Sequence, residues 1–253
     1  MYVDPKLPRQ IFGWHSPRLG LEMPIVSYGD RGHPVLLFPT AQADFLENER
    51  HGLIKAVEHH IFAGKCQIFS IDSINRFAWM NRDVPLPEAA RRQAAYAAYI
   101  EEEVIPHIRR TLNNPGARVA VCGASFGAFH AANQLFRRPD LFGTLLAMSG
   151  FYDLDPDYTR GYSDENVYFN NPAAYIPAID DEQTLRLLRE ECQIHLLTGR
   201  GRWEFPAMTT RFSEILSSKG IPHNLDMWGY DVDHDWPWWK KMLDHYIGSR
   251  LGW

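Results

Sequence analysis

Ser125, within Gly123-Ala124-Ser125-Phe126-Gly127, is the residue whose surroundings point most strongly to chemistry. The five residues fit the pattern G-x-S-x-G, and they lie directly between an expected buried strand and an expected helix. Glycines at both ends remove Cβ atoms that would collide in so sharp a turn. The turn should lift the Ser125 hydroxyl off the sheet edge, beside the free N–H groups of a helix start. This context predicts a nucleophile rather than an ordinary glycine-rich turn.

A serine hydroxyl attacks a carbonyl only when a base accepts its proton, and eleven histidines compete for that role. In folds with this serine turn, the base comes late in the chain, after the acid. His234 lies in a loop between an expected strand and the last expected helix, within reach of Ser125. His130, His195 and His245 lie inside expected helices or strands, which is typical of structural histidines. We therefore predict that His234 is the general base.

The acid that orients this histidine is expected in the loop after the strand at 193–197. Glu204 is the carboxylate in that loop, and glutamate serves as the acid in some proteins of this kind. Its alternative role is a favourable acid in the first turn of the following helix. Asp231 and Asp233 are further alternatives, although both are very close to His234 in sequence.

Two backbone N–H groups should stabilise the oxyanion that forms when an ester carbonyl is attacked. One is the N–H of Phe126, directly after the nucleophile. The other is expected from the loop that follows the strand at 35–38, where Ala41 and Gln42 are the candidates. The alternative reading of that loop is a plain connection between elements.

Aromatic residues make up 13% of the chain, and many of them lie on loops that border the expected site. A single aromatic residue usually packs in a core, but a group of them around a nucleophile favours an aromatic-walled cleft. We predict substrate contacts from Phe45, Trp79, Trp203 and Trp236.

Neither a metal nor a cofactor is expected. The cluster Asp231, Asp233, His234 and Asp235 is a run of near neighbours, which rarely converge on one ion. The adjacent residues His59 and His60 should face two directions on their helix. The turn at residues 123–127, called the serine elbow below, is not a phosphate loop, because no G-K-[ST] follows it.

Strands and helices alternate along the chain. Continuous apolar runs predict buried strands at 35–38, 67–71, 118–122, 144–148, 193–197 and 223–227. Helices are expected at 48–62, 88–112 (bent near Pro106), 126–136, 184–190, 206–219 and 236–251. Residues 11–28 read as two extended runs joined by a turn, and 149–180 reads as a long loop. The predicted fold class is α/β, with a mostly parallel sheet that helices cover on both faces.

Composition excludes several classes of protein. The 253 residues include 26 Lys and Arg against 31 Asp and Glu, and a formal charge of −5 argues against a nucleic-acid partner. No run of about 18 apolar residues is present to span a membrane. Without a secretory signal, and with the odd set Cys66, Cys122 and Cys192, we expect free thiols in the cytoplasm. The sequence is compatible with a homo-oligomer.

Together these residues resemble the "putative esterase" family of α/β-hydrolases, which includes S-formylglutathione hydrolase, feruloyl esterases, enterochelin esterase and the antigen 85 mycolyltransferases. The resemblance covers nearly the whole chain and rests on residues 14–16, 22–24, 123–127, 138–142, 149–150 and 234–236. It implies an α/β-hydrolase fold, a small-molecule ester substrate, no cofactor, and Ser125 and His234 as nucleophile and base. Many relatives carry Gly-x-x-Asp after the strand that precedes the acid. Here Arg202 stands where that aspartate is expected, and Glu204 lies two residues further on.

We therefore expect a single α/β-hydrolase domain over residues 1–253, with a loop-rich insertion at about 149–180 near the active site. The expected reaction is cleavage of a carboxylic ester through an acyl-enzyme. One alternative is an acyltransferase of the same family, which would use the same residues. The other is a non-catalytic scaffold, in which Arg200 and Arg202 would bind a carboxylate or phosphate on a ligand.

Overall fold

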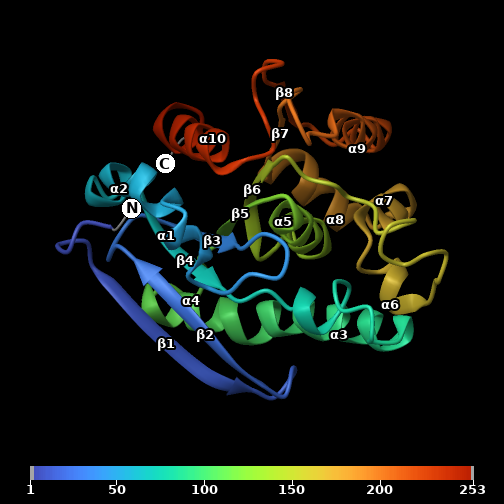
Figure 1. The fold of residues 1–253 in the computed structure, drawn as a ribbon, viewed down its shortest axis with the longest axis horizontal. Helices are drawn as coiled ribbons and strands as arrows, with labels where there is room; N and C mark the ends of the chain where they lie inside the picture. The colour runs from blue at the N-terminus through green and yellow to red at the C-terminus, as the bar shows by residue number, and fades with distance from the viewer. Residues whose placement is uncertain (1–2, 252–253) are drawn as a thin grey trace.

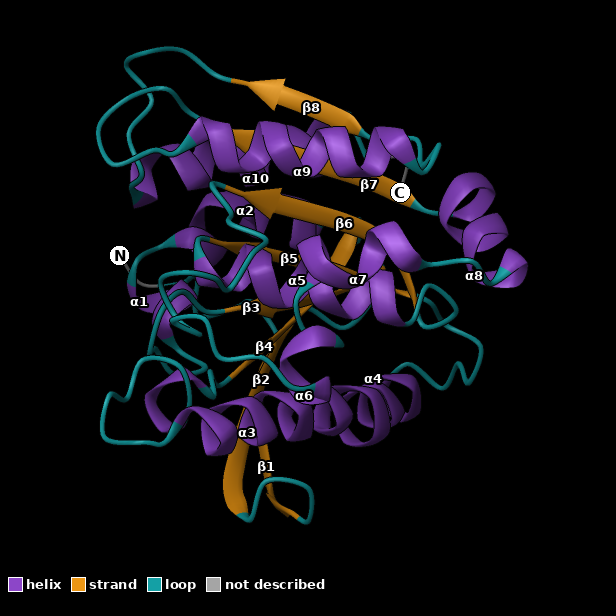
Figure 2. Ribbon diagram, turned by 90° about the vertical axis from the view of Figure 1, so that its right-hand side faces the viewer, coloured by secondary structure: helices purple, strands orange, loops and turns teal. Residues whose placement is uncertain are grey.

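One eight-stranded sheet runs through the computed structural model, which describes residues 3–251 (Figures 1 and 2). The strands lie in the order β1-β2-β4-β3-β5-β6-β7-β8. Pairs β1–β2 and β2–β4 are antiparallel, and the other five pairs are parallel. The strand bounds are β1 Arg9–Ser16, β2 Leu21–Tyr28, β3 His33–Phe38, β4 Cys66–Ile71, β5 Val119–Ala124, β6 Phe142–Met148, β7 Gln193–Thr198 and β8 Asn224–Met227. The predicted α/β class with a mostly parallel sheet is confirmed.

Helices cover both faces of this sheet. In Figure 1, α2 and α10 lie on one side of it, and α3, α5 and α9 lie on the other. The α-helical bounds are α1 Glu47–Arg50, α2 Leu53–Phe62, α3 Leu86–Tyr99, α4 Ile105–Thr111, α5 Phe126–Arg137, α6 Glu165–Tyr168, α7 Pro172–Tyr175, α8 Glu182–Arg186, α9 Pro206–Ser218 and α10 Trp236–Ser249. Because helices shield both faces, β4 and β5 are buried along their whole lengths, as their continuous apolar runs predict.

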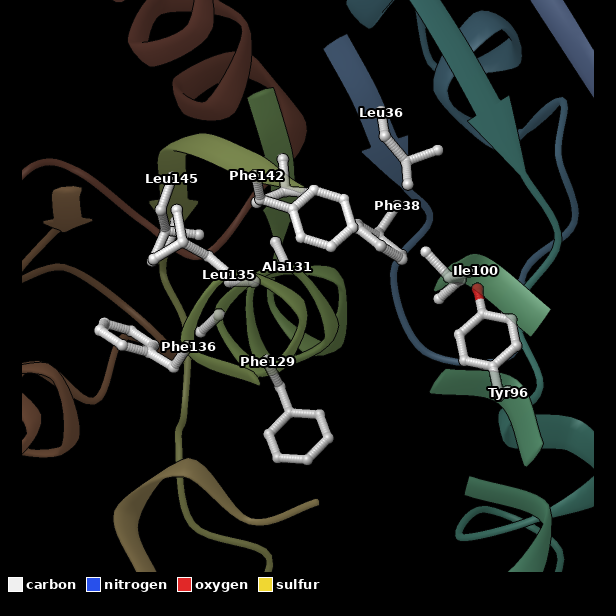
Figure 3. Close-up of a cluster of buried hydrophobic side chains, with 14 of the residues drawn as sticks. Leu36, Phe38, Tyr96, Ile100, Phe129, Ala131, Leu135, Phe136, Phe142 and Leu145 are labelled. Carbon is white, nitrogen blue, oxygen red and sulfur yellow. The ribbon is translucent and has the colours of Figure 1, made fainter. Parts of the chain in front are cut away.

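Two clusters of buried side chains hold the layers together, one on each face of the sheet. The larger cluster packs the sheet against α3, α5 and α9. Figure 3 shows part of it, with Phe38 of β3 and Phe142 of β6 near Ala131 and Leu135 of α5. Burial of this apolar surface fixes α5 on the sheet, and α5 begins directly after Ser125.

Two expectations about helices change in the structure. The helix expected at 88–112 is interrupted by a π-helical turn at Ile100–Val104, and Pro106 lies in the first turn of α4. Proline clashes with the carbonyl four residues earlier, and a π turn is one way for a helix to continue past that clash. The segment 149–180 is not one loop, because it contains α6, α7 and a 3-10 turn at Ile176–Ala178. Across residues 3–251, no helix is both long and apolar enough to cross a membrane.

Candidate active site

Ser125 occupies a strained turn between β5 and α5. Its φ of 58° and ψ of −123° lie outside the regions that ordinary residues prefer. A Cβ at position 123 would lie 2.4 Å from the carbonyl carbon of Gly127, and one at position 127 would lie 2.7 Å from the carbonyl oxygen of Pro39. Only glycines therefore let strand, turn and helix approach this closely. The backbone N–H of Ser125 donates to the carbonyl of Met148 at 2.9 Å, which ties the turn to β6.

Ser125 and His234 line the same cavity, which has a volume of about 470 Å³ and is called the Ser125 cavity below. It lies where the loops after β5, β6, β7 and β8 converge, at the carboxyl edge of the parallel strands. Its other described lining residues are Ser149, Gly150, Phe151, Tyr152, Asp153, Asp155, Pro156, Asp157, Tyr158, Ala173, Trp203, Phe205, Met208, Arg211, Phe212 and Ile215. Ligand sites of open α/β sheets lie at this edge.

Glu204 is the carboxylate that the structure places beside His234. The Nδ1 atom of His234 lies 3.7 Å from Oε2 of Glu204, which is an ion-pair distance longer than a hydrogen bond. The Glu204 side chain is only 1% exposed and that of His234 is 24% exposed, so the pair spans the boundary between the interior and the cavity. With Nδ1 on the Glu204 side, the Nε2 atom of His234 is the one left for a hydroxyl such as that of Ser125.

The two aspartates near His234 have other surroundings. Asp231 is exposed, and Asp233 accepts a hydrogen bond from the backbone N–H of Arg202 at 2.6 Å. The N–H of His234 in turn donates to the carbonyl of Arg202 at 2.9 Å. Asp233 therefore joins the loop after β7 to the loop after β8, and this joining brings Glu204 and His234 together.

Two glycines permit this contact between loops. A Cβ at Gly199 would lie 2.1 Å from the carbonyl oxygen of Val232, and one at Gly201 would lie 2.3 Å from Oδ1 of Asp233. The same two loops meet through an Arg200 guanidinium 5.4 Å from the centre of the Tyr230 ring. Arg200 and Arg202 therefore have partners within the protein, on the loop that carries His234.

Ser149, Thr198 and Trp239 support Glu204, and sequence patterns predicted this role for none of them. The hydroxyl of Ser149 donates to Oε1 of Glu204 at 2.5 Å, and that of Thr198 donates to Oε2 at 3.1 Å. The indole N–H of Trp239 donates to the Ser149 hydroxyl at 2.9 Å, which leaves the serine proton for Glu204. Ser149 directly follows β6 and Thr198 is the last residue of β7. Their position at the ends of parallel strands is the one feature of the sequence that could have indicated a place in the site.

The pKa of Glu204 lies below its ordinary value. Burial alone would raise this pKa, but the contact with His234 and the hydroxyls of Ser149 and Thr198 favour the charged form more strongly. Glu204 is therefore ionised at neutral pH, as the partner of a base that becomes positively charged must be.

The two candidate donors for an oxyanion differ in their surroundings. Phe126 is the first residue of α5, where N–H groups have no partner within the helix, and the Ser125 side chain does not cap them. Ala41 and Gln42 lie in the loop after β3, whose first residues pack against Gly127. Phe126, Ala41 and Gln42 are not among the residues that line the Ser125 cavity, so the oxyanion donors stay a prediction.

Of the four aromatic residues predicted to contact substrate, Trp203 is the one that lines the Ser125 cavity. It is 77% exposed and holds a positive φ of 63°, which turns its indole outward while Glu204 points inward. Trp79 is 7% exposed and lines a separate, smaller cavity of about 130 Å³. Trp236 stacks on His51 with ring centres 4.3 Å apart, and Phe45 packs against the core beside α2 and α10. The lining of the Ser125 cavity therefore supports the prediction for Trp203. It also includes Phe151 and Tyr158, two further aromatic residues that were not predicted to contact substrate.

The histidines interpreted as structural, His130, His195 and His245, do not line the Ser125 cavity, and His130 has the most distinct environment. It is 1% exposed, and its Nε2 lies 3.1 Å from Oδ1 of Asn75. Burial lowers its pKa to about 3. His195 is half-buried in β7, and His245 is exposed on α10.

The low pKa of His130 predicts acid sensitivity. The pKa of His130 in the folded protein lies below the ordinary value of about 6.5, so the unfolded chain binds a proton at a higher pH than the folded protein does. Stability from the neutral ring is therefore fully present above pH 6.5 and is lost as the pH falls toward 3. We expect the melting temperature of His130→Gln, which keeps a donor for Asn75 but does not titrate, to fall less between pH 6.5 and 4 than that of the wild type. The same fall in melting temperature for the two proteins between pH 6.5 and 4 would contradict this prediction.

Two further sequence-based expectations have clear outcomes. Cys66, Cys122 and Cys192 are free thiols, as expected. The expectation that His59 and His60 face two directions is wrong, because both Nε2 atoms lie within 3.3 Å of Oδ1 of Asp244 on α10. A carboxylate on a neighbouring helix draws the two rings together, which helix geometry alone does not reveal.

The pattern of the family described as "putative esterase" matches residues 71–248 of the chain. The protein belongs to that esterase family. The matched region contains Ser125, Glu204 and His234, and it makes the protein an enzyme of the esterase type. No curated protein sequence matches the chain.

Solved structures of esterases superpose on this esterase over nearly its whole length. A ferulic acid esterase has 18% identity and a TM-score of 0.72, with 95% of this chain and 96% of that chain covered. The fluorophosphonate-binding serine hydrolase F of Staphylococcus aureus has 14% identity and a TM-score of 0.72, with 95% and 97% covered. An S-formylglutathione hydrolase of Agrobacterium tumefaciens has 15% identity and a TM-score of 0.70, with both chains fully covered. At these identities the likeness shows the α/β-hydrolase fold.

Proposed function

We propose that this esterase hydrolyses a carboxylic ester through an acyl-enzyme, with Ser125 as nucleophile, His234 as general base and Glu204 as the orienting acid. The observation that carries the proposal is the arrangement around one cavity. A serine in a strained strand-to-helix turn and a histidine paired with a buried carboxylate both line it.

Each residue has a defined task in this reaction. The Nε2 atom of His234 accepts the hydroxyl proton as Ser125 Oγ forms a bond to the ester carbonyl carbon. The charge on the carbonyl oxygen is stabilised by the N–H of Phe126 and a second N–H from the loop after β3. His234 then gives the proton to the departing alcohol. It afterwards accepts a proton from the water that attacks the acyl-enzyme, and it returns that proton to Ser125 Oγ as the bond to the acyl group breaks and the acid product leaves. Glu204 holds the ring and stabilises its positive charge.

The walls of the Ser125 cavity favour an uncharged substrate with an apolar or aromatic group. Phe151, Tyr158, Phe212 and Ile215 supply apolar surface, which becomes favourable to bury when a ligand covers it. The described lining contains three aspartates and one arginine, namely Asp153, Asp155, Asp157 and Arg211. This excess of negative charge repels anionic substrates.

A panel of p-nitrophenyl esters tests this specificity. We expect kcat/KM for a neutral phenylacyl or medium-chain ester to exceed that for a matched ester with a terminal carboxylate by about tenfold or more, since one like-charge contact of about 1.4 kcal/mol gives that ratio. Asp157→Asn should narrow this ratio of kcat/KM values. The control Asp180→Asn, at a carboxylate that lines a different cavity, should leave the ratio unchanged. A preference for the anionic ester would overturn the proposed substrate class.

A cytoplasmic location is also part of the proposal. Cys66 and Cys122 are fully or nearly fully buried, and none of the three cysteines forms a disulfide. Free buried thiols of this kind fit a reducing compartment.

A further inference from the structure

The loop expected to supply the second oxyanion donor is held by buried polar side chains from outside it. The carbonyl oxygen of Ala41 accepts two hydrogen bonds, from the Ser73 hydroxyl at 2.9 Å and from the Asn75 side-chain amide at 2.7 Å. Ser73 and Asn75 are 2% and 0% exposed, in the segment that follows β4. The backbone N–H of Ser73 also donates to the carbonyl of Ala43 at 3.1 Å. The loop is therefore fixed from one side.

Asn75 is itself anchored to the helix of the nucleophile. Because its amide nitrogen donates to Ala41, its Oδ1 atom is the acceptor for Nε2 of His130, 3.1 Å away. His130 lies in α5, which begins directly after Ser125. The chain of contacts from Ala41 through Asn75 to His130 thus joins the loop after β3 to the helix that carries the other oxyanion donor.

The direction of the Ala41 carbonyl sets the direction of the Gln42 N–H. In a trans peptide the C=O of one residue and the N–H of the next point in opposite directions. With the Ala41 carbonyl turned toward Ser73 and Asn75, the N–H of Gln42 points away from them. Within residues 3–251, neither the N–H of Ala41 nor that of Gln42 has a hydrogen-bond partner, but only the N–H of Gln42 belongs to the peptide unit whose carbonyl Ser73 and Asn75 hold.

We propose that the N–H of Gln42 is the second oxyanion donor, and that Asn75 and Ser73 are positioning residues that aim it. The inference rests on the proposed function. It selects Gln42 over Ala41, because two hydrogen bonds from outside the loop hold the carbonyl of the Ala41–Gln42 peptide, whereas no such bond holds the peptide that carries the Ala41 N–H. A donor that is fixed before the reaction stabilises the developing charge without a reorganisation cost.

The test compares Asn75→Asp and Ser73→Ala with a matched control, Asn133→Asp. Asn75→Asp keeps the acceptor for His130 but loses the donor to Ala41. Asn133 is an equally buried asparagine of α5, and its side chain forms hydrogen bonds with Asn170 and Tyr175 rather than with the loop after β3. We expect each loop variant to lower kcat by about 10- to 100-fold with little change in KM, since loss of one oxyanion donor costs about 10²- to 10³-fold. The Asn133→Asp control should lose melting temperature but keep kcat.

Phosphonylation of the serine by a fluorophosphonate, which also develops charge on oxygen, should slow in parallel with kcat. If Asn75→Asp does not fold, Ser73→Ala decides. Folded variants with kcat and labelling rate within twofold of the wild type overturn the inference and leave the esterase proposal intact. A wild-type protein that neither labels nor hydrolyses esters overturns both.

A second inference comes from the contact between α2 and α10. His59 and His60 of α2 place their Nε2 atoms 3.3 Å and 2.9 Å from Oδ1 of Asp244 on α10. Their ring centres lie 3.8 Å apart, and one ligand atom from each of the three residues lies within 4.8 Å of the other two. Ligand atoms at about 2.0–2.1 Å from a tetrahedral Zn²⁺ are separated by about 3.3 Å, so these spacings suit one ion.

The geometry points to a binding site for a divalent transition-metal ion such as Zn²⁺ at His59, His60 and Asp244. Two imidazole nitrogens and one carboxylate oxygen are ligands that such ions prefer, and water can complete the coordination. The His60 side chain is 10% exposed, whereas those of His59 and Asp244 are 61% and 45% exposed, so the site is anchored on one side and open to solvent on the other. A bound ion would tie α2 to α10, on the face of the sheet away from α5.

Calorimetric titration of untagged, metal-free protein with Zn²⁺ tests this site. We expect one equivalent to bind and the melting temperature to rise. His59→Ala and Asp244→Asn should each weaken binding by about tenfold or more, because even losing a residue that supports a ligand costs about 10- to 100-fold. His15→Ala, which removes an exposed histidine paired with Glu22 alone, should bind like the wild type. Absence of binding by the wild type, or unchanged binding by His59→Ala and Asp244→Asn, overturns the inference.

Discussion

Replacing Ser125 with alanine should lower kcat for p-nitrophenyl ester hydrolysis by about 10⁴-fold or more. Removal of the nucleophile or the base from a serine triad leaves only the rate provided by binding and the oxyanion donors. Ser125 holds a strained φ of 58°, and alanine has the same backbone preferences, so the variant should fold with nearly the melting temperature of the wild type. Steady-state kinetics on purified protein measure the loss.

The matched control for this variant is Ser218→Ala, at an exposed serine that ends α9. It should retain wild-type kcat. Ser125→Ala protein that keeps even a tenth of wild-type activity, with contaminating esterase excluded by a mock purification, would remove Ser125 from the mechanism.

Replacing Glu204 with glutamine should lower kcat by about 10³- to 10⁴-fold, since loss of the acid in other serine triads costs about 10⁴-fold. Glutamine keeps the shape but cannot balance the positive charge that His234 acquires. It also meets two hydroxyl donors, from Ser149 and Thr198, with one carbonyl oxygen in place of two carboxylate oxygens. The melting temperature should therefore fall as well, and scanning calorimetry beside kinetics separates the two effects.

Glu214→Gln, at an exposed position of α9, and Asp233→Asn provide the comparison for Glu204. Glu214→Gln should behave like the wild type. Asp233→Asn loosens the joined loops and should cost less activity than Glu204→Gln. The reverse order would identify Asp233 as the acid and contradict the role given to Glu204.

Local sequence predicted the parts of the site that depend on short-range geometry. The serine elbow is set by two glycines and by the strand and helix on either side, all within a few residues. His234 and Glu204 followed from the order of elements, because loops after parallel strands meet at one edge of the sheet. The strand positions themselves followed from continuous apolar runs such as those of β4 and β5.

Contacts between segments far apart in sequence could not be predicted in this way. Ser149 and Trp239 support Glu204 because three separate elements converge, and no spacing in the sequence encodes that. Trp79 lies in what reads as a loop, yet it is 7% exposed because the segment folds back onto the core. The meeting of His59 and His60 at Asp244 depends on how α2 packs against α10.

Intact-mass measurement after treatment with a fluorophosphonate tests the central claim most directly. An activated serine attacks phosphorus and expels fluoride, so the account predicts one adduct per wild-type chain, located at Ser125 by peptide mapping. Ser125→Ala should gain no adduct, and His234→Ala should react far more slowly than the wild type. A folded wild-type protein that gains no adduct, or that carries it at another residue, would contradict the account and favour a non-catalytic binding scaffold.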